Sequence, residues 1–191
     1  MHKFFSVLFV LSSLWFLPLA SAGEPQLPPG MTMHRIQAGE LDASGWTLAE
    51  STEGKFTVKF PFKFNDFTLA IDDSKSPAKT TFTLGGKSLE GIKFSATRIV
   101  YRQGAKAAQE FFAKMERGEG LEAQKPSIEK IDFHGLPSVN TSYCSNEVCL
   151  WQRSLLIEAD LITLIIESPK QYKETVEAMT PIFFDSLEIV K

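Results

Sequence analysis

The chain has 191 residues, with 20 Lys and Arg against 23 Asp and Glu, and 43% of its residues are hydrophobic. One globular domain fits this length. The charge balance excludes a basic nucleic-acid-binding protein, and the hydrophobic content excludes a largely disordered chain. The composition therefore indicates a folded, nearly neutral protein.

Residues 1–22 have the pattern of an export signal. Lys3 precedes the apolar run FFSVLFVLSSLWFLPLA, and the small residues ASA at 20–22 form a site that signal peptidases accept. A retained anchor is the alternative, because the run approaches the length that spans a bilayer. Pro18 and the small residues favour cleavage, and no Cys directly follows that could carry a lipid. We expect a periplasmic or secreted protein without a stable membrane anchor.

The two cysteines fit an exported chain. Cys144 and Cys149 enclose four residues and are flanked on both sides by strand-like sequence. Residues facing each other across a hairpin are close enough for a disulfide. A redox or metal pair is the alternative, but the spacing is C-x4-C and no second Cys pair exists to complete a zinc site. A structural disulfide is predicted.

The first half of the chain predicts strands. Residues 23–45 are expected to be a proline-containing lead-in, with the domain beginning near Trp46 and forming one unit over residues 46–191. Alternation of apolar and polar residues predicts strands at residues 56–60, 67–71 and 81–84, and a further strand at residues 92–101 after a turn at Gly85-Gly86.

The hydrophobic period then changes to that of a helix. Over residues 105–117, the apolar positions Ala108, Phe111, Phe112 and Met115 fall on one helical face, and Gly118 is expected to end the helix.

Further strands and a second helix follow. Strands are expected at residues 128–133, in the cystine hairpin, and at residues 161–166, where both faces are apolar and therefore buried. A helix is expected to start at Pro169 and to present Tyr172, Val176, Met179 and Phe183. The order of elements predicts an α+β fold, a largely antiparallel sheet with helices on both faces.

Three short motifs resemble PsbP-like domains. They are Trp46-Thr-Leu followed by Gly54-Lys-Phe-Thr-Val-Lys-Phe-Pro61, Gly135-Leu-Pro137 before a strand, and the closing Phe183-Phe-Asp-Ser-Leu187. The resemblance spans about residues 46–191. It implies an α/β/α sandwich, a fold shared by the extrinsic photosystem subunit PsbP and by a nuclear Ran-binding protein. Members of this family mostly bind partners or assist assembly, so the resemblance implies a binding role.

One pair of residues is a weak candidate for a metal or catalytic site. Asp132 and His134 lie two apart on a predicted strand, so their side chains would share a face and could hold a cation or a proton. The alternative is a solvated strand end, because Gly135 supplies a turn directly after them. We favour this alternative and expect no metal site.

The remaining motifs do not predict a catalytic or ligand-binding site. Gly86-Lys87-Ser88 copies the tail of a phosphate loop without its first glycine, and Ser-x-x-Lys occurs at residues 76–79 and 127–130 without companion motifs. Asn140-Thr-Ser142 is a glycosylation sequon only in a eukaryotic secretory route. Arg98 and Arg153 lie in apolar strands, where pairing with acids such as Glu158 is expected.

Two functional hypotheses follow. The first is an exported, non-catalytic interaction or accessory protein that binds a protein of the cell envelope. The second is a periplasmic carrier that holds a small apolar ligand between sheet and helix. An enzyme is not expected, and neither is a cofactor, because no set of nucleophile, base and orienting group can be named. Nucleic acid is not an expected partner.

Overall fold

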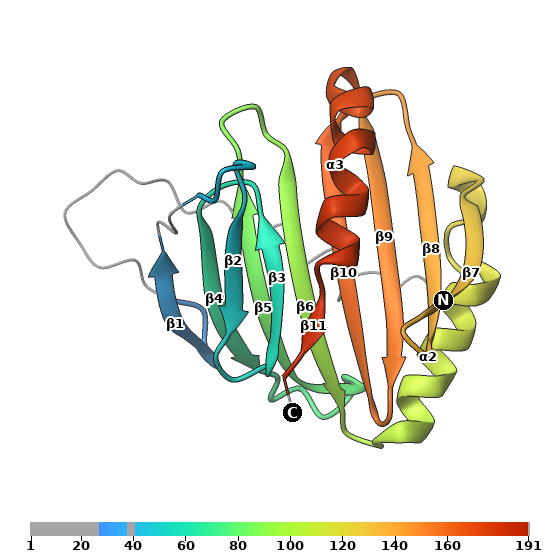
Figure 1. Ribbon diagram of the computed structural model, residues 1–191. Helices are drawn as coiled ribbons and strands as arrows, with labels where there is room; N and C mark the ends of the chain where they lie inside the picture. The colour runs from blue at the N-terminus through green and yellow to red at the C-terminus, as the bar shows by residue number, and fades with distance from the viewer. Residues whose placement is uncertain (1–26, 38–40, 191) are drawn as a thin grey trace.

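The computed structural model describes residues 27–37 and 41–190 (Figure 1). Within these residues lies an eight-stranded antiparallel sheet with the order β1-β4-β5-β6-β10-β9-β8-β7. Its strands are β1 (Met31–Gln37), β4 (Phe64–Ala70), β5 (Ala78–Lys87), β6 (Lys93–Tyr101), β7 (Ser127–Phe133), β8 (Leu136–Cys144), β9 (Val148–Ile157) and β10 (Asp160–Pro169).

A small sheet and two helices complete the described structure. The small sheet has the order β11-β3-β2 and consists of β2 (Thr47–Ser51), β3 (Phe56–Phe60) and β11 (Glu188–Ile189). The helices are α2 (Ala105–Arg117) and α3 (Lys173–Asp185), and single 3-10 turns occupy Glu122–Gln124 and Lys170–Tyr172. The expectation of an α+β fold with a largely antiparallel sheet is confirmed.

The two helices lie against opposite faces of the large sheet. On β10, Ile162, Leu164 and Ile166 belong to the core that contains α3 and the small sheet, whereas Leu161 belongs to the core that contains α2. Successive side chains of a strand point to opposite faces, so each helix covers a different one. β10 is buried on both faces, as its sequence predicts. In Figure 1, α3 and the small sheet lie in front of the large sheet.

Aromatic rings fill the core beneath α3. Phe183 of α3 lies 4.9 Å from the ring of Phe94 and 5.5 Å from the ring of Phe60, between ring centroids. All three side chains are fully buried. The protein's own phenylalanines therefore occupy the space between sheet and helix, which is where the carrier hypothesis places its apolar ligand.

The helix predictions hold closely. α2 has the predicted bounds, and its residues Ala108 and Phe112 are buried while Phe111 and Met115 pack at the edge of the same core. Gly118 ends the helix with φ 64°, a left-handed conformation that glycine adopts without strain. In α3, Val176 and Phe183 are buried, as predicted, but the helix starts at Lys173. The prediction of a start at Pro169 is wrong, because Pro169 ends β10 in an extended conformation.

The predicted start of the domain near Trp46 is also wrong. Residues 31–37 form β1, which pairs with β4 at the edge of the large sheet, with Met31 opposite Leu69 and Met33 opposite Phe67. The prolines of the preceding segment are a signal for an irregular chain, but they do not prevent a strand after them. β2 is a further strand that the sequence did not predict.

Gly85 and Gly86 do not form the expected turn. Both lie inside β5, where Gly85 faces Ser95 and Gly86 faces Phe94 of β6. A Cβ on Gly86 would come within 2.4 Å of the carbonyl oxygen of Lys63 and within 2.8 Å of the Phe62 ring. The Phe62–Lys63 segment comes so close to Gly86 that a side chain would not fit there, which explains why this position is a glycine. The turn follows Lys87 instead.

The predicted signal peptide, residues 1–22, lies outside the described residues. Among the described helices, none has the length and apolar character required to cross a bilayer.

Candidate functional site

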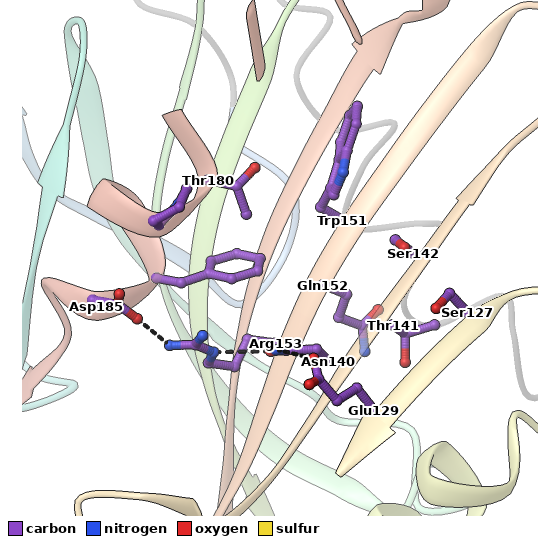
Figure 2. Close-up of a pocket in the computed structure, with 12 residues that line it drawn as sticks. Ser127, Glu129, Asn140, Thr141, Ser142, Trp151, Gln152, Arg153, Thr180 and Asp185 are labelled. Carbon is purple, nitrogen blue, oxygen red and sulfur yellow. Dashed lines mark hydrogen bonds and ion pairs between the residues drawn. The ribbon is translucent and has the colours of Figure 1, made fainter. Parts of the chain in front are cut away.

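A hollow of about 380 Å3, lined by both polar and aromatic residues, lies where α3 leaves part of the sheet uncovered. Its floor is formed by β9, β8 and the edge strand β7, and its wall is the C-terminal half of α3 (Figure 2). The lining residues are Ser127, Glu129, Asn140, Thr141, Ser142, Trp151, Gln152, Arg153, Thr180, Pro181, Phe184 and Asp185.

The register of the three strands arranges the floor in two rows. Ser127 faces Ser142, which faces Trp151, and these three residues form the first row. In the second row, Glu129 faces Asn140, which faces Arg153. Directly opposed residues share one face of a sheet, so both rows point toward the side of α3.

Thr141 and Gln152 lie between these rows on the same strands, and their side chains therefore point to the face of α2. There the Gln152 side chain donates to the hydroxyl of Ser154 at 2.9 Å and contacts the sulfur of Met115 on α2 at 3.9 Å. These two residues contribute backbone to the hollow.

A chain of polar contacts crosses the second row. Arg153 Nη1 donates to Asp185 Oδ1 at 2.7 Å, and Arg153 Nε donates to Asn140 Oδ1 at 2.9 Å (Figure 2). The amide nitrogen of Asn140 donates in turn to Glu129 Oε2 at 3.5 Å. The floor therefore consists of planar polar groups that hold one another in place.

Aromatic rings enclose the guanidinium of Arg153. Its central carbon lies 5.0 Å from the ring centroid of Phe133 and 5.0 Å from that of Phe184. Only 10% of the Arg153 side chain is exposed, whereas 63% of the Asp185 side chain is exposed. The Arg153 side chain is thus held between β7 and α3, where it has a structural role. Its acidic partner, Asp185, faces solvent.

Pro181 interrupts the hydrogen bonds of α3 at the wall of the hollow. It lies inside the helix and has no backbone N–H. The carbonyl oxygen of Glu177 therefore lacks the donor that normally comes from four residues further on. The α3 residues that line the hollow are Thr180, Pro181, Phe184 and Asp185, and Glu177 is not among them.

The structure places the weak candidates Asp132 and His134 in a hairpin turn. β7 ends at Phe133, and His134 and Gly135 both have positive φ, 55° and 82°. Asp132 Oδ1 accepts the backbone N–H of Gly135 at 2.7 Å. The idea that both residues share a strand face is wrong, because His134 has left the strand and Asp132 caps the turn. No group of three or more potential metal ligands occurs among the described residues.

Cys144 and Cys149 are joined by a disulfide, with Cα atoms 4.0 Å apart. They face each other at the ends of β8 and β9. The bridge fastens the hairpin that forms the floor of the hollow, two residues from Ser142.

The two arginines have acidic partners, but Glu158 is not one of them. Arg98 Nη2 lies 2.7 Å from Asp160 Oδ2, and Arg153 pairs with Asp185. Glu158 lies in the turn between β9 and β10, five residues along the chain from Arg153. Five residues of strand span roughly 16 Å, too far for an ion pair.

The sequence pointed to only part of the hollow. Arg153 is identifiable in the sequence as a charge in an apolar strand, and Asn140 as part of a sequon. Asp185 closes the network from 32 residues away in the chain. Nothing in the local pattern around Asp185 identifies it as the partner.

No protein-family model matches the chain. No curated protein matches it either. Among solved structures, it is similar to the cyanobacterial PsbP of Synechocystis sp. PCC 6803, with a TM-score of 0.47 and 12% identity over 90% of this chain and 99% of that one. It is also similar to LpqN, involved in cell envelope biogenesis of Mycobacterium tuberculosis, with a TM-score of 0.33 and 12% identity over 86% of this chain and 87% of that one.

The first of these structures is a PsbP, and PsbP-like domains are the family that the three sequence motifs resemble.

Proposed function

We propose that this protein is an exported, non-catalytic accessory protein that binds another protein of the cell envelope through the hollow beside α3. The observation that carries the proposal is the network from Asp185 through Arg153 and Asn140 to Glu129. It holds polar groups in fixed positions on an open surface, which lowers the entropy cost of binding.

The composition of the hollow suits a protein surface. Trp151 and Phe184 supply aromatic area, and Ser127, Ser142 and Glu129 supply polar groups at the rim. Interfaces combine aromatic anchors with such polar rims. The disulfide and the sequence pattern of residues 1–22 support a location outside the cytoplasm.

A non-catalytic role is part of the proposal. In the hollow, the hydroxyls of Ser127 and Ser142 face each other and an indole, without a histidine among the lining residues to act as their base. The carrier hypothesis has no observation in its favour, since Phe60, Phe94 and Phe183 fill the space expected for its ligand.

Site-specific photocrosslinking in the envelope of the source cells tests the proposal. A photoreactive amino acid replaces Ser127, which is exposed at the hollow, or Ser74, an equally exposed serine between β4 and β5. We expect one or a few discrete protein adducts from position 127 and none of these from position 74. Identical adducts from both positions, or no protein adduct from position 127, would reject the hollow as the binding surface.

N-terminal sequencing of the same exported protein tests the location. We expect the mature chain to begin at Gly23. An intact N-terminus in a membrane pellet would show a retained anchor instead.

A further inference from the structure

The charge that the hollow presents to solvent is negative. Glu129 is exposed, and 63% of the Asp185 side chain is exposed. Arg153 is bound to Asp185 at 2.7 Å and offsets the charge of that carboxylate, so the unbalanced negative charge is that of Glu129. Lys130, next to Glu129 on β7, points to the other face and pairs with Glu116 of α2 at 3.1 Å. The net charge of Glu129, Asp185 and Arg153 is therefore negative.

The other polar groups of the hollow favour a ligand that donates hydrogen bonds. Ser127 and Ser142 place two hydroxyls side by side in the first row. The carboxylate of Glu129 lies one row away on β7. Hydrogen-bond acceptors are thus present in both rows of the floor.

The apolar part of the hollow suits a long aliphatic stem. Trp151 lies at the inner end of the first row, and Phe184 and Pro181 line the wall. Lysine and arginine side chains bury their methylene groups against such surfaces while the charged end stays near polar groups. Within the chain, the Arg153 guanidinium lies over the Phe184 ring and beside an acid, which shows that this wall accommodates a cation.

Resting on the proposed function, we propose that the hollow receives a lysine or arginine side chain of the partner protein. The cationic end lies among Glu129, Ser127 and Ser142, and the stem lies along Trp151. The protein therefore recognises a basic residue on an exposed segment of its partner. A neutral saccharide would use the same hydroxyls and indole, but it would gain nothing from the negative charge.

Nuclear magnetic resonance titration of the 15N-labelled exported protein tests this inference. The probes are the peptide acetyl-Gly-Lys-Gly-amide, its arginine counterpart, and a norleucine counterpart that keeps the stem and removes the charge. We expect saturable shifts at the amides of Ser127, Glu129 and Ser142 and at the Trp151 indole with the two basic peptides. Binding of the norleucine peptide should be at least about 5-fold weaker.

Glu129→Gln and Glu110→Gln form a matched pair of variants. Both residues are exposed acids, but Glu110 lies on α2, which covers the opposite face. We expect Glu129→Gln to weaken binding of the lysine peptide about 2- to 5-fold and Glu110→Gln to leave it unchanged. Added salt should weaken binding to wild type more than to Glu129→Gln.

Three results would overturn the inference. They are equal binding of the lysine and norleucine peptides, an unchanged affinity in Glu129→Gln, and shifts of the same residues by maltotriose without shifts by the basic peptides. The crosslinking result separates this failure from failure of the proposed function. Adducts specific to position 127 would keep the protein-binding role and reject only the basic residue as its ligand.

Discussion

Arg153 of β9 and Asp185 of α3 form an ion pair, at 2.7 Å between Nη1 and Oδ1, that ties the last turn of the helix to the sheet. The two partners differ in exposure, because Arg153 is nearly buried and most of the Asp185 carboxyl faces solvent. Their contributions to stability should therefore be unequal.

We predict that Arg153→Met lowers the free energy of unfolding more than Asp185→Asn does. Loss of the guanidinium removes the contacts with Phe133, Phe184 and Asn140, an effect of about 2–3 kcal/mol. Asp185→Asn keeps an acceptor oxygen in a largely exposed position and should cost about 1 kcal/mol or less. Denaturant unfolding of both variants measures the difference, and the reverse order would show that the carboxylate, not the stacked guanidinium, stabilises the helix end.

Phe183→Ala should be among the most damaging substitutions in α3. Phe183 is fully buried and contacts the rings of Phe60 and Phe94, so truncation leaves a cavity that costs about 3–5 kcal/mol. Ile182→Ala is the matched control, because Ile182 is its neighbour in the helix and is 44% exposed. That control should change stability by about 0.5 kcal/mol or less. Similar thermal melts for the two variants would contradict the packing of α3.

The disulfide should be present in the exported protein and should stabilise it modestly. Thiol counting on unreduced, denatured protein should find no free thiol at Cys144 or Cys149. The bridge closes a short loop, so Cys144→Ser with Cys149→Ser should cost about 2 kcal/mol by the chain-entropy model. Two titratable thiols in the exported protein would show that the pair is reduced there.

The turn after β7 should tolerate changes at both weak candidates for a metal site. Asp132→Ala removes one hydrogen bond to the N–H of Gly135 and should cost about 1 kcal/mol or less. His134→Asn should be neutral or stabilising by a few tenths of a kcal/mol, because His134 has φ 55° and asparagine tolerates this conformation better. Thermal melts with and without zinc or calcium complete the test. A metal-dependent gain of several degrees in wild type that both variants lose would establish a metal site.

Asp42 should titrate at unusually low pH. The hydroxyl of Ser44 and the backbone N–H of Trp46 donate to its carboxylate, and these bonds lower its pKa from 3.8 to about 2. Because the folded pKa is depressed, the stabilisation of this turn is present above pH 3.8 and is lost as the pH falls through about 2. Carboxyl carbon resonances measure the titration midpoint. Ser44→Ala removes the largest cause, so the midpoint should rise toward 3.8, and an unchanged midpoint would assign the shift to another group.

The sequence alone determined the elements whose pattern is local. The helix over residues 105–117 was predicted from the spacing of Phe111, Phe112 and Met115, because packing against one surface imposes a period of 3.6. The doubly apolar run at residues 161–166 predicted a strand buried on both faces, and the short loop between two strand-like segments predicted the Cys144–Cys149 hairpin. These features depend on neighbours within a few residues of one another.

Tertiary structure decided the features that depend on distant segments. Gly85 and Gly86 lie in a strand because the Phe62–Lys63 segment approaches their backbone, and residues 31–37 form a strand because β4 offers an edge. The hollow arises in the same way. Its rows depend on the register of three strands, and Asp185 meets Arg153 only because α3 crosses β9. The packing of whole elements decides that these two charges, 32 residues apart, form an ion pair. The local sequence around each residue does not predict it.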